Sequence, residues 1–352
     1  MNEEFRHGGD IYRNPVEYDF SVNINPLGMP EGSIQAAHEG ILLANRYPDY
    51  KGEALCREIA NAEHVKESQV LLGNGAAELI YALCNALRPK KCLVCAPSFQ
   101  EYEAAAVQAG GEMMYWNLFE EENFRIQKDF LSAITESADI LFLCNPNNPT
   151  GSLIEKEFLL EIAEKCEQSK TYLCIDECFL PFLEQEEELT MKRELELFSH
   201  LIVLRAFTKL YGMPGLRLGY AMSANDYLLG RMKCALQPWN TSIPAQMAGI
   251  AAIQDLEYVK KTRKLIAEEK EYLIRELSDG FVEKVYDSAA NYIFFQSRTD
   301  LKEGLLRQGI LIRSCGNYRN LTGKYFRIGV RTHEENEELI RRWRKITWQS
   351  QS

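Results

Sequence analysis

The sequence predicts an α/β fold, with a large domain built on a mostly parallel central sheet flanked by helices, and a smaller α+β domain. Between about residue 70 and residue 235, short apolar segments alternate with helical patterns. The short segments are apolar throughout, which is typical of strands buried on both faces of a parallel sheet. After about residue 240, a long charged helical stretch is followed by short strands and a final amphipathic helix, which indicates the smaller domain.

The expected elements follow from hydrophobic periodicity. In the large domain, apolar segments predict strands at 69–75, 91–97, 140–144, 171–177 and 201–207. Apolar residues at helical spacing predict helices at 77–87, 98–110 and 155–168. In the smaller domain we expect a long helix at 255–279, strands at 291–296, 310–315 and 325–330, and a C-terminal helix.

The change of pattern also predicts the domain organisation. We expect residues 1–44 to form an N-terminal arm and part of the small domain, and residues 45–240 to form the large domain. Residues 241–352 are expected to form the small C-terminal domain, with the boundary in "WNTSIPAQ". No internal repeat or low-complexity linker interrupts the chain.

Composition and charge narrow the classes of function. The 352 residues are 46% hydrophobic and 26% charged, as in an ordinary globular protein, and the net charge is −11. The acidic excess disfavours binding to nucleic acid or to an anionic membrane, because both need basic surface. No stretch reaches the roughly 18 apolar residues of a membrane span. The polar, acidic N-terminus lacks the pattern of a signal peptide, so we expect a cytoplasmic protein.

Ten cysteines are scattered through apolar segments, which favours buried free thiols in a reducing cytosol. Cys92 and Cys95 have CxxC spacing. A zinc site needs a second such pair or histidines at ligand spacing, and neither is near. We therefore expect no metal.

Polar residues and glycines gather where the expected parallel strands end, which is where such sheets bind ligands. In "GNGAAE" (73–78), glycines precede a helix whose first N–H groups attract a phosphate, although most such turns are only tight connections. In "NPNNPTG" (145–151), the prolines fix a loop whose asparagines offer amide donors, although Asn-Pro turns are common.

Two ionisable residues stand at the ends of apolar strands. A buried carboxylate at Asp176 is costly unless it meets a cation such as a protonated ring nitrogen, and a structural ion pair or a helix cap is the alternative. Lys209 follows "LIVLRAF", and burial there would lower its pKa and leave a neutral amine that attacks an aldehyde. The alternative is a surface lysine near a turn. Arg217, eight residues further on, offers a bidentate partner for a phosphate.

Together and in this order, "NPNNPTG", "IDECF" and "FTKLYGMPGLRLGY" resemble the pyridoxal-phosphate enzymes of the class I and II aminotransferase fold, over essentially the whole chain. The resemblance implies that Lys209 forms an aldimine with pyridoxal 5′-phosphate. It implies that Asp176 pairs with the pyridine nitrogen, so that the ring acts as an electron sink. It also implies that Asn148 bonds the phenolate oxygen of the ring and that Phe99 stacks on the ring.

The same resemblance assigns the cofactor phosphate and the subunit arrangement. The implied phosphate-binding residues are Gly75, Ala76, Ala77, Thr208 and Arg217. Tyr47 would reach the phosphate from a neighbouring subunit, which implies a homodimer with shared active sites. Ala206 departs from the pattern, because relatives often carry serine or threonine there beside the phosphate.

Two subfamilies are similar to this sequence: the threonine-phosphate decarboxylases of cobalamin biosynthesis and the histidinol-phosphate aminotransferases. The opening "HGGDIYRNPVEYDFSVNINPLG" looks like that of the decarboxylases, which implies substrate contacts for His7 and Asn25. A loose terminal segment is the alternative for His7. Phe179 stands where many aminotransferases carry a tyrosine that donates to the phenolate oxygen, and the decarboxylases carry phenylalanine there.

Three arginines near the C-terminus indicate the same substrate class. Arg313, Arg327 and Arg331 would concentrate positive charge around a doubly anionic phosphorylated amino acid. Arg327 matches the family's arginine for the substrate carboxylate. Surface salt bridges are the alternative for Arg313 and Arg331. Histidinol phosphate carries no carboxylate and needs fewer arginines.

We therefore expect a decarboxylase of L-threonine O-3-phosphate that forms aminopropanol phosphate for cobalamin biosynthesis. An aminotransferase of the histidinol-phosphate type is the alternative. A non-catalytic module that senses the cofactor in a transcriptional regulator is more remote, because only about 45 residues precede the large domain and they show no helix-turn-helix pattern.

Overall fold

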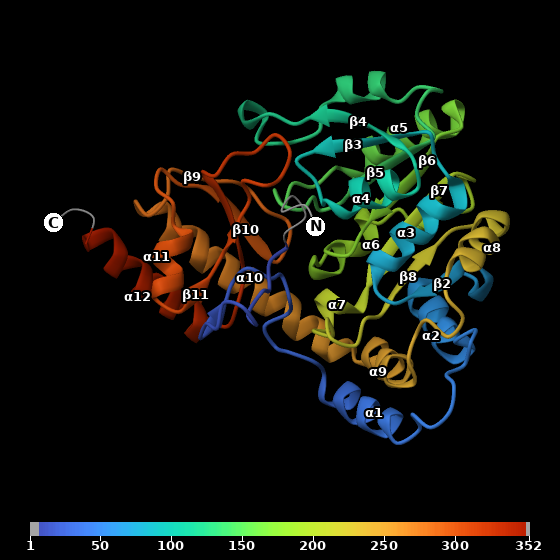
Figure 1. Ribbon diagram of the computed structural model, residues 1–352, viewed down its shortest axis with the longest axis horizontal. Coiled ribbons are helices and arrows are strands. Elements are labelled where there is room, and N and C mark those ends of the chain that lie inside the picture. Colours follow the sequence, from blue (N-terminus) through green and yellow to red (C-terminus); the bar gives the residue numbers. More distant parts are fainter. Residues whose placement is uncertain (1–6, 350–352) are drawn as a thin grey trace.

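The computed structural model describes residues 7–349, and its largest element is a seven-stranded sheet (Figure 1). Across the sheet the strands lie in the order β2 (Val70–Gly73), β8 (Gly219–Met222), β7 (Leu201–Ala206), β6 (Tyr172–Asp176), β5 (Ile140–Cys144), β3 (Lys91–Ala96) and β4 (Glu112–Asn117). The strands from β7 to β4 are parallel, and β8 is antiparallel to both of its neighbours. The predicted mostly parallel sheet is confirmed.

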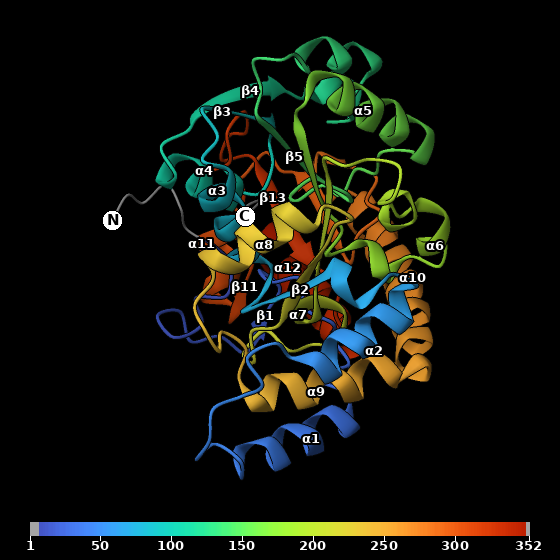
Figure 2. The same ribbon diagram turned by 90° about the vertical axis from the view of Figure 1, so that its right-hand side faces the viewer.

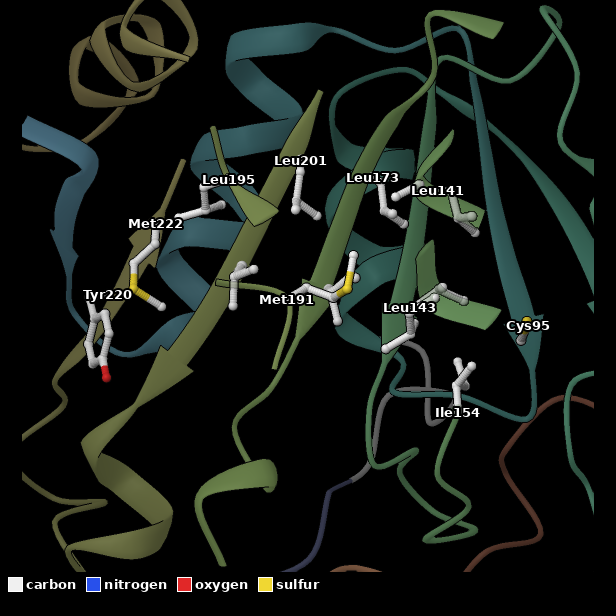
Figure 3. Packing of buried hydrophobic residues seen from close by; sticks show 14 of the residues in the cluster. Cys95, Leu141, Leu143, Ile154, Leu173, Met191, Leu195, Leu201, Tyr220 and Met222 are labelled. Atoms are coloured by element: carbon white, nitrogen blue, oxygen red, sulfur yellow. The ribbon is translucent and has the colours of Figure 1, made fainter. Parts of the chain in front are cut away.

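Helices cover both faces of this sheet (Figures 1 and 2). One face packs against α3 (Ala76–Leu87), α4 (Glu101–Gln108) and α8 (Asp226–Ala235). The other face packs against α2 (Glu53–Glu63), α5 (Lys156–Ser169) and α9 (Ile243–Gln254), and Figure 3 shows the apolar side chains of this second layer.

The CxxC pair on β3 is divided between these two layers. Successive residues of a strand point to opposite faces, so side chains three positions apart never share a face. Cys92 accordingly packs in the layer under α3 and α4, whereas Cys95 packs in the layer shown in Figure 3. The two thiols lie on opposite sides of the sheet and do not form a redox or metal-binding pair.

A second, antiparallel sheet is built mainly from the C-terminal part of the chain. Its strands lie in the order β12 (Arg313–Ser314), β13 (Tyr325–Gly329), β10 (Tyr292–Gln296) and β9 (Lys284–Val285). The helices α10 (Leu256–Ser278), α11 (Lys302–Arg307) and α12 (His333–Gln349) surround a core centred on residues such as Phe295 and Trp343. The N-terminal strand β1 (Tyr18–Asp19) pairs in parallel with β11 (Ile310–Leu311), so the N-terminal arm lies beside this region.

The chain passes from the large sheet to the small sheet within α10, which crosses the molecule in Figure 1. Helix α9 still lies on the large-sheet side, because it packs against α2 and against α1 (Glu31–Ile41). The contact with α1 is close at Gly40, where a β-carbon would come within 2.7 Å of Pro244. We therefore propose a domain boundary inside α10 rather than at residue 240.

Several helices, such as α2 and α8, were not expected from the sequence, and three strands also differ from the prediction. The edge strand β4 was not expected, although its sequence EMMYWN holds a short apolar run from Met113 to Trp116. The strand β8 lies inside "RLGYAM", where glycine and arginine obscure the strand pattern. The expected strand 310–315 is divided, since Ile310–Leu311 pairs with the N-terminal arm and Arg313–Ser314 pairs with β13.

Within residues 7–349, no helix combines the length and the apolar character needed to cross a membrane. All ten cysteines are free thiols, and eight of them are buried.

Candidate active site

A cavity of about 240 Å³ opens at the carboxyl ends of β5, β6 and β7 and extends to the small sheet. A larger hollow of about 430 Å³ lies beside β2 and α8 and contains none of the predicted site residues. The first cavity brings most of them together, and its lining includes His7, Ala76, Ala77, Phe99, Asn148, Asp176, Phe179, Thr208, Lys209, Arg217, Arg313 and Arg327.

Lys209 lies on the short helix α7 (Phe207–Leu210), directly after β7. Its ammonium group lies 5.7 Å from the centre of the Phe179 ring. Burial lowers the pKa of Lys209 to about 8, the positive charges of Arg327 and Arg217 lower it as well, and Asp176 opposes them. The lowered pKa gives a substantial fraction of neutral amine near neutral pH, and the neutral amine is the nucleophilic form.

Asp176 is the last residue of β6, and its carboxylate is almost fully buried. The backbone N–H of Cys178 donates to one carboxylate oxygen at 2.9 Å, and the Tyr102 hydroxyl donates to the other at 2.8 Å. Burial, with Asp176 beside it, raises the pKa of Tyr102, so the phenol stays protonated and acts as the donor. Tyr102 was not predicted, because in the sequence it is one more apolar-face residue of a helix.

The first turn of α3 and the side chain of Arg217 form a polar corner at one end of the cavity. Gly75 precedes α3 with a φ of 82° and no side-chain cap, so the first N–H groups of the helix are open to an anion. A β-carbon at Gly75 would come within 2.5 Å of the Arg217 guanidinium. Glycine is thus required for the arginine to approach the helix start. Ala76, Ala77 and Thr208 complete the corner.

Asn148 connects the cofactor side of the cavity to the small sheet. Its side-chain oxygen accepts hydrogen bonds from the Arg327 guanidinium and, at 3.4 Å, from the Tyr318 hydroxyl. Tyr318 was not predicted, and it supplies a phenol to the lining of the cavity. The ring of Phe179 instead packs edge-on against Tyr292, with centroids 5.1 Å apart.

His7 and Phe99 form one wall of the cavity, with their ring centroids 5.9 Å apart. The Nε2 atom of His7 lies 2.8 Å from a carboxylate oxygen of Glu101. The Tyr81 hydroxyl donates to the other oxygen of that carboxylate at 2.9 Å. The structure therefore places His7 over the cavity and against α4, although its side chain remains 45% exposed.

Arg313 and Arg327 lie side by side on the small sheet, because β12 and β13 pair these two residues. Arg313 donates to the side-chain oxygen of Asn317 at 2.9 Å, and its guanidinium lies 5.1 Å from the centre of the Tyr318 ring. Arg327 is 5% exposed and donates to the backbone carbonyl of Ser21 at 3.1 Å. Its Nε has no hydrogen-bond partner among residues 7–349.

Two predicted substrate contacts lie outside the cavity. Asn25 is buried, and its amide donates to the carbonyl of Leu210 at 2.6 Å and to the Thr262 hydroxyl at 2.7 Å, so it joins α7 to α10. Asn23, two residues earlier, lines the cavity in its place. Arg331 is directed away, because Glu335 binds its guanidinium at 2.8 Å across one turn at the start of α12.

Tyr47, expected at the phosphate, does not line the cavity of its own chain. Its side chain is 75% exposed and stacks on Trp239, with ring centroids 4.4 Å apart. No group of metal-binding side chains is present among the residues that the structure describes.

Comparison with known proteins shows the family to which the chain belongs. The chain matches the family model described as aminotransferase class I and II over residues 17–342. It is 37% identical to a threonine-phosphate decarboxylase from Salmonella typhimurium, covering 97% of this chain and 96% of that protein. It is 31% identical to an adenosylcobalamin biosynthesis bifunctional protein from Leptospira interrogans, covering 95% of this chain and 40% of that protein.

A solved structure supports the same placement. The histidinol-phosphate aminotransferase from Clostridium acetobutylicum superposes with a TM-score of 0.88 at 31% identity, covering 94% of this chain and 99% of that chain. The chain therefore belongs to the aminotransferase class I and II family.

Proposed function

We propose that the protein is a pyridoxal-5′-phosphate-dependent decarboxylase of L-threonine O-3-phosphate, which forms aminopropanol phosphate in cobalamin biosynthesis. The observation that carries the proposal is the composition of the cavity. One end presents a lysine, a carboxylate and a phosphate-binding corner, and the other end presents Arg313, Arg327 and His7. The two relatives named in connection with threonine phosphate and adenosylcobalamin support it.

The residues present fit pyridoxal 5′-phosphate. Gly75 leaves room for Arg217 beside the open N-terminus of α3, which suits a phosphate. The Asp176 carboxylate, held by Tyr102 and the Cys178 N–H, suits a protonated pyridine nitrogen. When bound, the cofactor supplies an aldehyde for covalent attachment and a ring that accepts an electron pair.

The side chains around the ring position have separate roles in this proposal. Lys209 would provide the amine that attaches to the aldehyde, and its lowered pKa increases the fraction of neutral amine over that of an ordinary lysine. The Asp176 carboxylate would balance the pyridinium charge. Asn148 would hold the phenolate oxygen of the cofactor, and Phe99 would cover its ring. Lys209 lines the same cavity and would be the residue that returns a proton to the substrate α-carbon.

The other end of the cavity suits a substrate with two anionic groups. Arg313 and Arg327 are neighbours on paired strands, and both reach the cavity. Arg327 is a buried cation that lines the cavity, and a substrate carboxylate would balance its charge. Arg313 and His7 are then the candidates for the phosphate of the substrate.

Steady-state turnover tests the choice between the two reactions. We expect the holoenzyme to release CO2 and form aminopropanol phosphate from O-phospho-L-threonine without an added oxo acid. The alternative is an aminotransferase of the histidinol-phosphate type, and the similarity to the Clostridium acetobutylicum enzyme favours it. Sustained conversion of histidinol phosphate that requires 2-oxoglutarate, with no product from O-phospho-L-threonine, would overturn the proposal. Failure of both reactions would point to the non-catalytic sensing module.

We also propose a homodimer in which Tyr47 reaches the cofactor phosphate of the neighbouring subunit. Tyr47 and Trp239 form an exposed aromatic pair, and the nearby Leu42 is 81% exposed. A hollow lined by Trp239 is also lined by Arg217, which belongs to the phosphate corner. The surface beside Trp239 therefore borders the phosphate corner. Sedimentation should give twice the mass of one chain, and Tyr47→Phe should weaken cofactor binding.

A cytoplasmic location is part of the same proposal, because ten free thiols suit a reducing compartment.

A further inference from the structure

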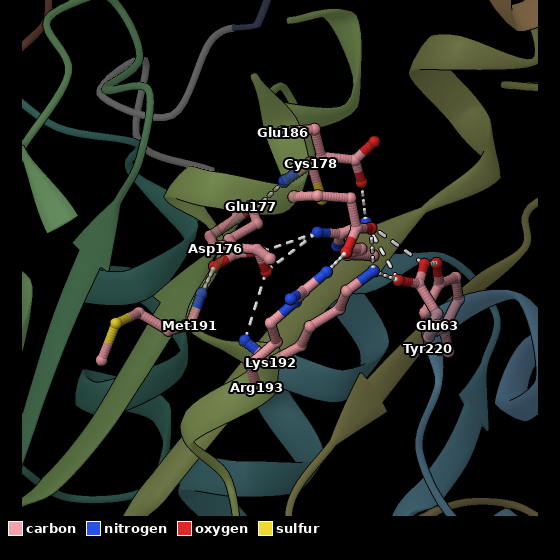
Figure 4. A network of polar contacts seen from close by, with 12 residues as sticks. Glu63, Asp176, Glu177, Cys178, Glu186, Met191, Lys192, Arg193 and Tyr220 are labelled. Carbon is pink, nitrogen blue, oxygen red and sulfur yellow. Dashed lines mark hydrogen bonds and ion pairs between the residues drawn. The ribbon is translucent and has the colours of Figure 1, made fainter. Parts of the chain in front are cut away.

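A cluster of buried charges lies at the ends of β6 and β7, and Figure 4 shows Glu63, Glu177, Glu186 and Lys192 in it. Asp176 belongs to the cavity, and Glu177, the next residue, belongs to the cluster. On β7, Ala206 lines the cavity, and Arg205, the residue before it, belongs to the cluster. Successive side chains of a strand point to opposite faces of the sheet. At the ends of β6 and β7, one residue therefore lines the cavity and its neighbour belongs to the charge cluster.

Arg205 is the centre of this cluster and is 2% exposed. Its guanidinium donates to Glu177 at 2.9 Å, to Glu63 at 3.2 Å and to Glu186. Burial opposes ionisation of Glu63, but Arg205 and Lys192 more than offset it and lower the pKa of Glu63. Because each buried carboxylate meets a cation, the cluster holds its partners in fixed positions.

The cluster extends to α10 through Arg263. The guanidinium of Arg263 bonds the Glu186 carboxylate, and its Nε donates to the carbonyl of Pro181 at 3.0 Å. Glu186 lies on α6 (Glu186–Leu189) and bonds Arg205 with its other oxygen. Glu186 is therefore a bridge between the strand that leads to Lys209 and the first half of α10.

The second half of α10 contacts the segment that leads into the small sheet. Lys270 donates to the carbonyl of Ser288 at 2.8 Å, just before β10. Strand β10 pairs with β13 so that Phe294 lies opposite Arg327, and Arg327 in turn lies opposite Arg313. A continuous series of contacts thus runs from Arg205 through α10 to the two arginines of the cavity.

We propose that Arg263 is a positioning residue that sets where Arg327 and Arg313 stand relative to Lys209 and Asp176. It touches neither cofactor nor substrate. By fixing α10 to the buried charge cluster, it holds the small sheet at the distance that lets one substrate reach both ends of the cavity. The effect on substrate binding rests on the proposed function, because the ligand of the two arginines is assigned there.

The substitution Arg263→Met tests this role, since it removes the charge and keeps most of the volume of a side chain that is 21% exposed. We expect KM for O-phospho-L-threonine to rise about tenfold, as for other mutations within a coupling network. The absorbance of the bound cofactor and kcat should change little. Arg263→Lys keeps a cation for Glu186 and should recover part of the loss. Arg275→Met is the matched control, because Arg275 lies on α10 but is 69% exposed.

A double-mutant cycle tests whether Arg263 acts through Glu186. If it does, Arg263→Met combined with Glu186→Gln raises KM no more than the larger single change, because both remove the same link. Additive effects would overturn the proposal, as would a folded Arg263→Met enzyme with unchanged KM. An Arg263→Met enzyme that loses cofactor binding and kcat together would show a general structural role and would also overturn it.

Hydrogen exchange provides a readout that does not depend on the substrate. In the Arg263→Met holoenzyme we expect faster amide exchange in β12 and β13, with unchanged exchange in β6 and β7. This result would stand even if O-phospho-L-threonine were not turned over, so a failure of the proposed function remains distinguishable. Equal exchange in the native and variant enzymes would contradict the role of Arg263.

Discussion

At the cofactor end of the cavity, Asp176, Lys209 and Ala76 stand at or just beyond the ends of strands of one sheet, within about 130 residues of each other. At the substrate end, His7, Arg313 and Ser21 come from the N-terminal arm and the C-terminal sheet, which lie about 300 residues apart in the chain. The cofactor end is formed by a single sheet and its helices. The substrate end forms only where the N-terminal arm and the C-terminal sheet meet.

The difference indicates how the two ends respond to change. Residues at the cofactor end are supported by the core of the large sheet and by the buried charge cluster beneath it. Residues at the substrate end depend on hydrogen bonds between regions, such as those of Arg327 with Asn148 and with Ser21. Substitutions at the first end should therefore reduce the chemistry for every substrate, whereas substitutions at the second should change substrate selection.

Asp176→Asn should have the largest effect and should act at the cofactor end alone. The amide has the shape of the carboxylate but cannot balance a pyridinium charge in a buried site. We expect kcat to fall about 10³-fold, as when a key electrostatic group of an active site is removed. Measurements with several amino acid substrates should show the same loss for each. A loss confined to KM of one substrate would show that the two ends are not separate.

Arg327→Met should have the next largest effect and should act at the substrate end. Removing a buried hydrogen-bonded charge from a carboxylate should lower kcat/KM for O-phospho-L-threonine about a hundredfold. The absorbance of the bound cofactor should be retained. Arg331→Met is the matched control, because Glu335 already binds Arg331 outside the cavity, and it should leave kcat/KM within about twofold of native. An equal loss of kcat/KM in both variants would contradict the placement of Arg327 inside the cavity and Arg331 outside it.

The pH dependence of cofactor attachment should reveal the environment of Lys209. A pKa of about 8 means that the neutral fraction of the amine increases about tenfold between pH 7 and pH 9 and levels off above pH 9. A lysine with an ordinary pKa would increase its neutral fraction about a hundredfold over the same interval. The rate at which the apoprotein binds the cofactor covalently, measured by absorbance, distinguishes the two cases.

Tyr102→Phe should have the smallest effect of the series. It removes one hydrogen bond to Asp176 without removing the aromatic packing on Phe142, whose ring centroid lies 5.1 Å away. We expect kcat to fall about fivefold, the value of one such hydrogen bond. The loss should vanish in the Asp176→Asn background, because the carboxylate that the phenol supports is absent there. If Tyr102→Phe lowered kcat about fivefold in the Asp176→Asn background as well, Tyr102 would not act through Asp176.

The same contrast explains how much of the site could be predicted from sequence. Lys209, Asp176 and Asn148 follow buried strands, so the sheet rule alone predicts that they converge, and the structure brings all three to one cavity. The role of each residue toward the cofactor was implied only by the resemblance to a family. The mostly parallel sheet was predicted for the same reason, since long apolar strands separated by helices leave few other arrangements.

Residues that depend on contacts between distant segments could not be predicted in this way. Asn25 lies in a motif shared with the decarboxylases, but its amide is used to join α7 to α10. Arg331 is two residues beyond β13, and the turn that follows directs it to Glu335. Tyr102 carries no signal in the sequence, because a phenol on the apolar face of a helix is usually part of a core. Tyr318 lies in a turn between β12 and β13, and nothing in the polar residues around it indicates a site.

The most direct test of the proposed function is a single turnover of O-phospho-L-threonine by the holoenzyme in heavy water, with the products analysed by mass spectrometry. The proposed decarboxylation predicts CO2 and an aminopropanol phosphate that carries one deuterium on the carbon that lost the carboxylate. The cofactor should remain in its aldehyde form. Formation of an oxo acid that retains the carboxylate, together with pyridoxamine phosphate, would contradict it.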